Sequence, residues 1–213
     1  MSRPSSSQNP RTRPLKRPRQ ARARFTVQAI YDAYVRIWQR DGWEQLTTRK
    51  VALETGIAIG TLYDYFPSKE ALHSGYVRHC IEQMIQHIDE QVVAPAGLTW
   101  RQRIHLLIHH LAGLADDKNT WFSPDMMWLE PAVADTRLQQ RAYDELLAVW
   151  HRVIAACDDL TPRPADTTLE ALHLSVWGGR RYGLQVELDD ERRRAWAAEL
   201  ERLCTTALAH SNE

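Results

Sequence analysis

The stretch LTTRKVALETGIAIGTLYDYF, residues 46–66, decides the fold of the chain. Thr47 is a suitable N-cap for a short helix over residues 48–55, and Gly56 supplies the tight turn that ends this helix. Another short helix is predicted over residues 59–66. Two short helices that are joined by a glycine turn and packed on a preceding helix form a helix-turn-helix unit. The stretch therefore predicts a unit whose second helix enters the major groove of DNA.

The side chains of this second short helix divide into two kinds. Leu62 and Phe66 lie four residues apart and are expected to pack inward. Thr61, Tyr63 and Tyr65 are then expected to point outward. A soluble helix gains little from exposed tyrosines, whereas a DNA-binding helix gains ring contacts with thymine methyl groups and hydroxyl contacts with phosphate oxygens. The pattern therefore favours a surface that binds DNA.

Helical periodicity continues along the rest of the chain. An apolar stripe predicts a first helix that begins near Arg24 and stops at Gly42, and Ser68 caps a fourth helix over about residues 69–93. No period-two strand and no internal repeat is found, so the sequence predicts an all-α fold of about nine helices. The later helices are predicted around residues 104–114, from Ser123-Pro124 to a stop at Pro131 about two turns later, around residues 138–153, from Asp166 to Val186, and after Asp189.

The composition is that of a globular chain with an uneven distribution of charge. The 213 residues are 44% apolar, and the formal net charge is zero. Residues 1–70 hold 13 Lys and Arg against 6 Asp and Glu, whereas residues 71–213 hold 14 against 21. This asymmetry favours a basic front that meets a polyanion, and the alternative is chance segregation over two domains.

Cysteine usage and hydropathy limit the compartment. Three cysteines lie far apart without a CxxC spacing, which favours reduced thiols in the cytosol over a disulfide scaffold or a zinc ribbon. No apolar run approaches the roughly eighteen residues of a membrane span, and no apolar region of a secretory signal follows the Arg-rich N-terminus. These features predict a cytoplasmic protein without a membrane segment.

Residues 1–23 are rich in Pro, Ser and Arg and contain no acidic residue. Such a segment buries too little apolar surface to offset the entropy of ordering, so we predict a disordered basic arm. Two roles remain open for the arm: a passive solubilising tail, or a segment that lies along phosphates or in a minor groove. The domains predicted after the arm are a helix-turn-helix domain over residues 24–68 and a helical domain over residues 69–213.

The motifs LTTRKVA, GTLYDYF and SKEAL occur at fixed spacings, together with Gly42-Trp43 and Gly56. Together they resemble the N-terminal helix-turn-helix of TetR-type transcriptional regulators, over about residues 25–73. The all-α remainder is also similar to that family's plan, although at the level of the fold alone. The resemblance implies a sequence-specific DNA-binding regulator.

The resemblance also implies roles for individual residues. Thr48 and Arg49 match positions that reach a backbone phosphate and a base edge, and Arg49 is expected to present its fork to guanine. Tyr63 is expected to meet a phosphate, and Lys69 matches a phosphate clamp at a helix N-terminus. The alternatives are a solvated charge at Arg49 and a simple helix-end charge at Lys69. The full set of predicted DNA-binding residues is Thr48, Arg49, Ile59, Gly60, Thr61, Tyr63, Tyr65 and Lys69.

Ile59 departs from the pattern of the family. Many members carry a polar residue directly before the glycine that is Gly60 here. Ile59 either touches a thymine methyl group or simply packs, so the base preference at that point stays open.

The C-terminal helices of the resembling family dimerise and usually enclose a small-molecule pocket. Two-fold symmetry then places two recognition helices roughly 34–36 Å apart, so the operator is a near-palindrome. The last two helices are predicted to form the homodimer. Gly178, Gly179 and Gly183 reduce helix propensity, and they either allow a close approach to a partner or a ligand or mark an ordinary kinked helix.

Aromatic and methionine side chains suggest an apolar or aromatic effector, although such residues are more often plain core. His105 and His109 lie four residues apart, which is a metal-ligand spacing, and His173 can approach them in three dimensions. No nearby Cys or acidic residue completes a ligand set, so we predict no metal site and assign His109 to a polar edge of the pocket. The predicted pocket residues are His109, Trp121, Met126, Met127, Trp128, Trp150 and Trp177.

The function that these features favour is a dimeric repressor that a small ligand releases from a palindromic operator. One alternative is a DNA-binding protein of the same type without an inducer, or one that acts as an activator. An enzyme is the remaining alternative. The sequence contains no GxSxG, HExxH, P-loop or dinucleotide fingerprint, so we predict no catalytic residue and no cofactor.

Overall fold

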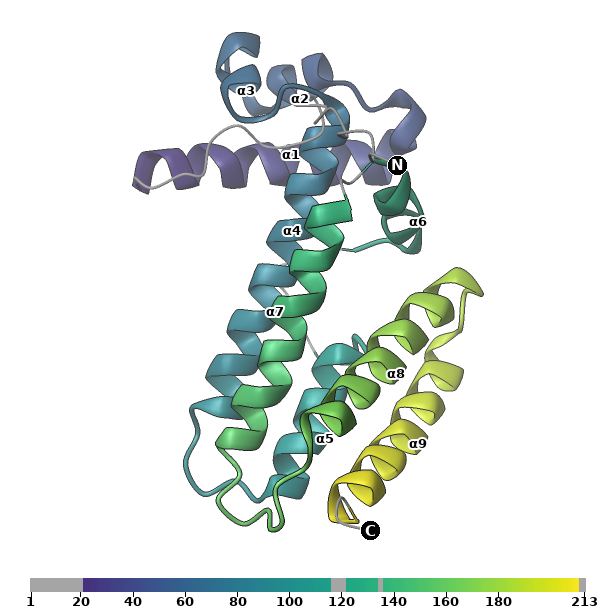
Figure 1. Cartoon of the computed structure of the whole chain (residues 1–213). Coiled ribbons are helices and arrows are strands. Elements are labelled where there is room, and N and C mark those ends of the chain that lie inside the picture. Colours follow the sequence, from purple (N-terminus) through teal and green to yellow (C-terminus); the bar gives the residue numbers. More distant parts are fainter. Residues whose placement is uncertain (1–20, 116–121, 134–135, 211–213) are drawn as a thin grey trace, which may run out of the picture. The chain divides into compact units, whose positions relative to one another are not determined.

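The computed structural model describes residues 21–115, 122–133 and 136–210. Within these ranges the chain forms α-helices and one π-helical turn, Asp89–Val93, and contains no strand, so the predicted all-α class is confirmed (Figure 1). The α-helices are α1 (Ala21–Gln45), α2 (Thr48–Thr55), α3 (Ile59–Tyr65), α4 (Lys69–Ile88), α5 (Trp100–Leu111), α6 (Pro124–Val133), α7 (Thr136–Ala155), α8 (Asp166–Gln185) and α9 (Asp190–Ala209).

The chain divides into two compact units, and the division falls inside α4, between His79 and Cys80. Leu129–Thr136 also belongs to the first unit. The domain boundary predicted between residues 68 and 69 stays a prediction. None of the described helices combines the length and the apolar content that a membrane span requires.

Helix α1 is interrupted near its C-terminal end, where the sequence predicted a stop. Gly42 has φ 74° and ψ 176°, which a side chain with a Cβ rarely tolerates, and the chain resumes a helical course up to Gln45. At its other end α1 begins at Ala21, so the last three residues of the predicted arm are helical. Ala21 and Ala23 are strong helix formers, and the rest of the arm lies outside the described residues.

Helix α2 has the caps that the sequence predicted. The Thr47 hydroxyl accepts a hydrogen bond from the backbone N–H of Lys50, and Gly56 adopts the left-handed conformation at φ 73°. These contacts satisfy backbone groups that a short helix otherwise leaves unpaired. Three residues separate α2 from α3, and Phe66 closes α3 by donating its backbone N–H to the carbonyl of Leu62.

The first unit has an aromatic core between α1 and the start of α4. The ring of Tyr34 lies 5.0 Å from that of Tyr76 and 5.7 Å from that of Trp38, and its hydroxyl is hydrogen-bonded to Nδ1 of His73 at 2.8 Å. Leu62 contributes the fully buried side chain of α3. Each such burial stabilises the fold by about 1.5–3 kcal/mol, so this core holds the two short helices in place.

The second unit has its own core of residues from α4, α5, α7, α8 and α9. Buried Arg103 of α5 donates hydrogen bonds to the backbone carbonyls of Val92, Val93 and Pro95 at the end of the π-helical turn. It thereby satisfies carbonyls that the helix end leaves unpaired. Helices α8 and α9 lie side by side (Figure 1), and α5 contacts both.

Helix α6 differs from its prediction. It begins with Ser123 and Pro124 as expected, but it continues through Pro131 to Val133. Pro131 removes one backbone donor and so costs one helix hydrogen bond, but it does not end the helix at once. The predicted stop at Pro131 is therefore wrong by two residues.

Candidate nucleic-acid interface and effector site

The predicted orientation of the α3 side chains can be followed residue by residue. Leu62 and Phe66 are buried, as the sequence predicted. Tyr63 points outward with 45% of its surface exposed, whereas Thr61 and Tyr65 are only half-buried. Helix α3 therefore has one apolar face toward the first unit and one polar face toward solvent.

The N-terminal turn of α3 is open to approach from outside. A Cβ atom built on Gly60 meets no heavy atom within 4 Å, and the backbone of Gly60 does not require glycine. Ile59 beside it is an exposed apolar side chain. Packing among the described residues does not explain a glycine here, and the position is open to close approach by another molecule.

Helices α2 and α3 present their polar groups together. The hydroxyl of Thr48 lies 3.3 Å from the hydroxyl of Tyr63, within hydrogen-bond distance across the two helices. Because Thr48 begins α2 and Tyr63 is in the middle of α3, this contact sets the spacing of two predicted phosphate contacts.

Most of the cations near α2 have partners within the chain. Arg36 and Arg40 pair with Glu54 at 2.9 and 3.2 Å, and Lys50 pairs with Asp41 at 3.3 Å. Hydrogen bonds from Arg36 lower the pKa of Glu54, which keeps that carboxylate charged. By contrast, the exposed side chain of Arg49 has no hydrogen bond or ion pair within the described part of the chain. Arg49 is thus available to an external acceptor.

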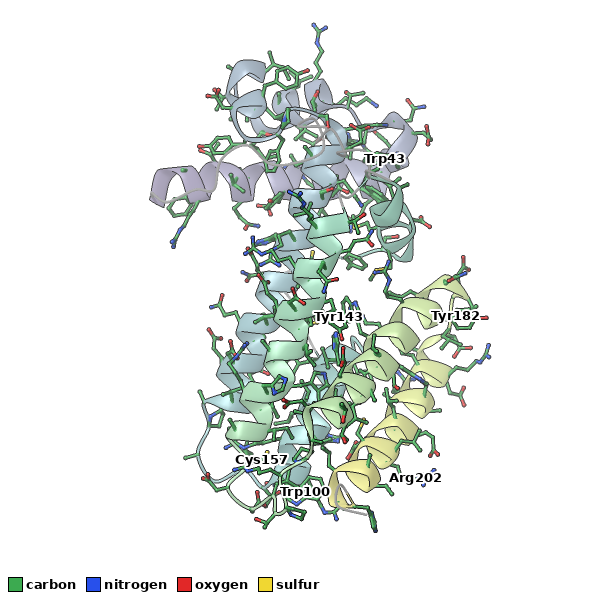
Figure 2. The ribbon with its side chains drawn as sticks, in the orientation of Figure 1. Trp43, Trp100, Tyr143, Cys157, Tyr182 and Arg202 are labelled. Atoms are coloured by element: carbon green, nitrogen blue, oxygen red, sulfur yellow. The ribbon has the colours of Figure 1, made fainter. Side chains whose placement is uncertain are left out.

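Lys69 is held at the N-terminus of α4 by an aromatic ring. Its ammonium lies 4.2 Å from the centre of the Trp43 ring and 3.5 Å from the Trp43 carbonyl oxygen. A cation held over a ring loses little further entropy when it binds an anion, and the first turn of a helix attracts anions as well. Trp43, seen in Figure 2, is therefore a supporting residue that the set of predicted contacts lacked, although its place directly after Gly42 was visible in the sequence.

The predicted effector residues lie in different surroundings. Trp150 and Met126 are fully buried, and Trp177 is half-buried against the core of the second unit. Met127 is half-buried on α6. His109 lies on α5 with its ring centre 4.3 Å from that of His105. Trp121 and the side chain of Trp128 lie outside the described residues.

The core of the second unit contains polar atoms without partners. Both ring nitrogens of His173 and the indole N–H of Trp150 are buried and make no hydrogen bond among the described residues. Burial lowers the pKa of His173, so its ring is neutral near pH 7. Each unsatisfied group costs about 1–3 kcal/mol unless another molecule satisfies it.

Tyr143 of α7, labelled in Figure 2, contacts His173 of α8. Its ring meets that of His173 edge-on at 4.9 Å, and its hydroxyl donates a hydrogen bond of 2.6 Å to Glu170. Trp150 follows Tyr143 by seven residues and therefore occupies the same face of α7. Sequence reasoning placed His173 near the other histidines. In the sequence, the one indication of its actual surroundings was its position on α8, opposite the aromatic residues Tyr143 and Trp150 of α7.

Comparison with known proteins agrees with the geometry of the first unit. Residues 22–74 match the family model described as bacterial regulatory proteins, tetR family. The chain is 32% identical over 91 residues to the fatty acid metabolism regulator protein of Bacillus subtilis, which covers 42% of this chain and 46% of that protein. It is 35% identical over 82 residues to the HTH-type transcriptional repressor KstR of Mycolicibacterium smegmatis, which covers 38% of this chain and 39% of that protein.

These curated relatives match less than half of their own length. A solved structure extends the likeness of the fold: the SmeT–triclosan complex has a TM-score of 0.58 at 20% identity, over 83% of this chain and 90% of that one. That identity supports the fold alone. Residues 22–74 thus match the helix-turn-helix segment of the tetR family of bacterial regulatory proteins, and they belong to an all-α chain.

Proposed function

We propose that the protein is a dimeric, sequence-specific transcriptional repressor that a small apolar or aromatic ligand releases from a near-palindromic operator. The observation that carries the proposal is the open polar face of α2 and α3, where Gly60 has no packing neighbour and Arg49 has no partner among the described residues. A cytoplasmic location, with double-stranded DNA as the partner, belongs to the same proposal.

In this proposal α3 lies in the major groove. Ile59, Gly60 and Thr61 approach base edges at its N-terminal turn, while Tyr63 and Tyr65 contact the backbone. At the start of α2, Thr48 reaches a phosphate and Arg49 reaches a base edge or the adjoining phosphate. Lys69 clamps a further phosphate from its position over the Trp43 ring.

The last two helices form the dimer in this proposal. Leu174, Gly178 and Tyr182 recur every four residues on one face of α8, and Tyr182 leaves 63% of its surface exposed. On α9, Leu203 adds an exposed apolar side chain. Exposed apolar residues that cluster on two adjacent helices support a surface that a second copy covers.

The glycines of α8 support the same interface. A Cβ on Gly179 would lie 2.7 Å from the ring of Trp196 on α9, so packing within the chain explains that glycine. A Cβ on Gly178 would meet nothing within 4 Å, so packing within the chain leaves that glycine unexplained. A close approach by the partner's helix at Gly178 accounts for it.

The proposed effector binds between α7 and α8. His173 and Trp150 lack hydrogen-bond partners in an apolar core, which supports a largely apolar ligand with a donor or acceptor of its own. The names of similar proteins refer to fatty acid metabolism in one case and to a triclosan complex in another, and both point to apolar molecules. Such a ligand releases DNA only to the extent that it prefers a dimer whose recognition helices are out of register.

Selection of binding sites from random duplex DNA tests the proposal. The purified full chain is incubated with the library at two salt concentrations. We expect a near-palindromic motif whose binding weakens steeply with salt, because Lys and Arg displace counterions from phosphates. Failure to enrich any motif, with weak binding that is lost at moderate salt, would contradict sequence-specific readout.

Effector binding is then tested on the selected operator. Apolar and aromatic compounds, including long-chain fatty acids and their thioesters, are titrated into the complex, and DNA release is followed by fluorescence anisotropy. Release by a compound supports the induced repressor. No release by any compound would favour the alternative of a regulator without an inducer, and increased transcription from an operator-linked promoter would favour an activator.

A further inference from the structure

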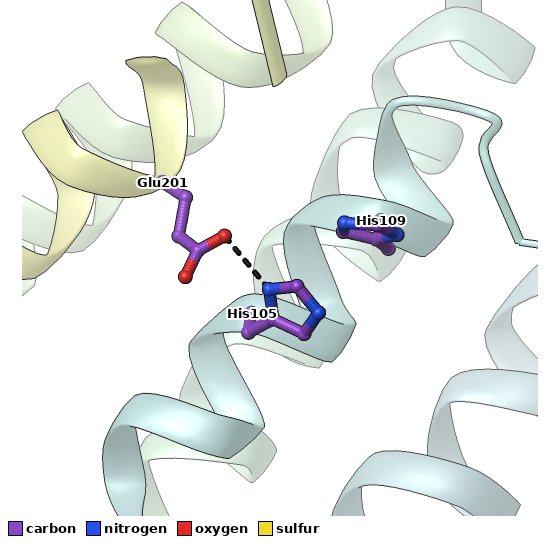
Figure 3. A group of neighbouring side chains, drawn as sticks. All are labelled: His105, His109 and Glu201. Atoms are coloured by element: carbon purple, nitrogen blue, oxygen red, sulfur yellow. Dashed lines mark hydrogen bonds and ion pairs between the residues drawn. The ribbon is translucent and has the colours of Figure 1, made fainter. Parts of the chain in front are cut away.

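Two histidines and a glutamate meet between α5 and α9 of the second unit, and one of them, His109, is also a predicted pocket residue. His105 and His109 lie one turn apart on α5, and Glu201 reaches them from α9 (Figure 3). Nδ1 of His105 is 2.8 Å from a carboxylate oxygen of Glu201. The three residues each offer one ligand atom, and these atoms lie within 4.8 Å of one another.

We propose that His105, His109 and Glu201 bind a divalent transition-metal ion of the zinc type, which links α5 to α9. Two imidazole nitrogens and one carboxylate oxygen form a ligand set that zinc uses, with a remaining position for water. A tetrahedral ion with bonds of about 2.1 Å holds its ligand atoms about 3.4 Å apart. Side-chain rotations are therefore enough to close the group around an ion. The proposal is independent of DNA binding.

The surroundings of the three groups suit a metal. His109 is half-buried on α5, and its ring centre lies 4.3 Å from that of His105. His105 is exposed, and Glu201 is half-buried, so an ion can reach the group from solvent. Oxygen-seeking ions such as Mg²⁺ are not expected to bind two imidazoles.

Cys157 and Cys204 of the same unit are weak competitors for the ion. Burial raises the pKa of Cys157 to about 11 and that of Cys204 to about 12, so both thiols stay protonated. A metal binds the thiolate, and these two side chains therefore offer little affinity at neutral pH. His151 lies 3.8 Å from Asp166, but no group of three metal ligands forms around it among the described residues.

Titration of the untagged, chelator-treated full chain with ZnCl₂ tests the proposal. Calorimetry is expected to give one ion per chain, and Co²⁺ is expected to give visible absorption bands of a low-coordinate nitrogen–oxygen site. Thermal unfolding should shift upward by about 5 °C or more when Zn²⁺ exceeds its dissociation constant a hundredfold, because the ion binds only the folded arrangement. MgCl₂ should leave both readouts unchanged.

Three conservative variants locate the ion: His105→Gln, His109→Gln and Glu201→Gln. Each should weaken Zn²⁺ binding by at least about a hundredfold, since even the loss of an outer hydrogen bond to a metal ligand costs 10- to 100-fold. His151→Gln is the matched control and should bind normally. Circular dichroism without metal confirms that each variant folds. Undiminished Zn²⁺ binding in the three variants, or no binding by the unaltered chain, would overturn the proposal.

Discussion

At the scale of single residues, what matters is which polar groups already have partners in the chain. Glu54 and Asp41 bind the cations around α2, whereas Arg49 has no partner among the described residues. In the second unit, both nitrogens of His173 are buried without a hydrogen bond to any described residue. A charge that the fold leaves unpaired, or a buried donor that it leaves unsatisfied, is where an external molecule gains most from binding.

Two substitutions separate base contact from phosphate contact. Arg49→Ala should lower operator affinity by about 1–3 kcal/mol and relax the preference at one base pair. Lys69→Ala should weaken binding to all sequences alike and reduce the slope of log affinity against log salt by about 1. Anisotropy titrations over a salt series measure both effects.

The matched control for these variants is Arg101→Ala, which removes the same charge from an exposed position on α5 in the second unit. It should leave affinity and salt slope unchanged. If Arg49→Ala and Lys69→Ala behave like this control, the proposed docking of α2 and α4 is wrong.

His173 predicts a dependence of stability on pH. Its pKa in the folded protein lies below the ordinary value of 6.5 because the ring is buried. Its stabilising contribution is therefore complete above pH 6.5 and is lost as the pH falls toward the folded-state pKa, since the unfolded chain binds the proton first. Urea unfolding at pH 7.5 and at pH 5.5 measures the loss of stability on acidification. This loss should be smaller in His173→Phe, which keeps an aromatic ring beside Tyr143, than in the unaltered chain. The exposed His151→Phe should retain the full loss, and equal pH dependence in all three proteins would contradict the assignment.

At the scale of elements, α8 combines three glycines that have different neighbours. Gly179 contacts the ring of Trp196, and Gly183 lies close to Leu188, so both allow the chain to turn back into α9 at short range. Gly178 has no such neighbour. Gly179 and Gly183 thus allow close packing within the chain, whereas Gly178 is left open to the surface of another molecule.

Gly178 and Gly179 therefore respond differently to alanine. Gly179→Ala should destabilise the second unit by about 1–3 kcal/mol, because its Cβ would overlap the Trp196 ring. Gly178→Ala should not destabilise the isolated chain and should gain up to about 1 kcal/mol of helix propensity. Gly178→Ala should also weaken the dimer. Thermal unfolding measures the loss of stability in Gly179→Ala, and sedimentation velocity measures the dimerisation of Gly178→Ala. A Gly178→Ala protein that dimerises normally would remove the argument for close approach at that position.

At the scale of the whole molecule, the proposed function requires two copies. One helix-turn-helix offers a single set of phosphate contacts, and two linked sets gain affinity because the second binding event is intramolecular. The charge distribution supports the proposal, because residues 1–70 carry an excess of Lys and Arg whereas residues 71–213 carry an excess of Asp and Glu. Ligand control then depends on the geometry of the dimer rather than on any contact between ligand and DNA.

Disruption of the dimer should therefore abolish tight operator binding. Leu203→Arg places a charge on the proposed interface and should give a monomer in sedimentation experiments. Affinity for the palindrome should fall by about a hundredfold or more, toward that for a half-site. Ala198→Arg adds the same charge to another exposed face of α9 and should remain dimeric. If neither variant dissociates into monomers, the dimer surface lies elsewhere.

The sequence by itself determined the short helices, their caps and the polar face of α3. These features depend on neighbours within about four residues: Thr47 accepts from Lys50, Gly56 takes the left-handed turn, and Leu62 and Phe66 share a face. Its error at the end of α6 came from treating Pro131 as decisive near a helix terminus.

The tertiary structure alone decided which distant residues meet. Trp43 supports Lys69 from 26 positions away, and Glu201 reaches His105 from 96 positions away. No spacing rule predicts such pairs, because they follow from how α1 meets α4 and how α5 packs against α9, and not from local periodicity. For the same reason the sequence showed two histidines without a third metal ligand, whereas the fold brings a carboxylate to them.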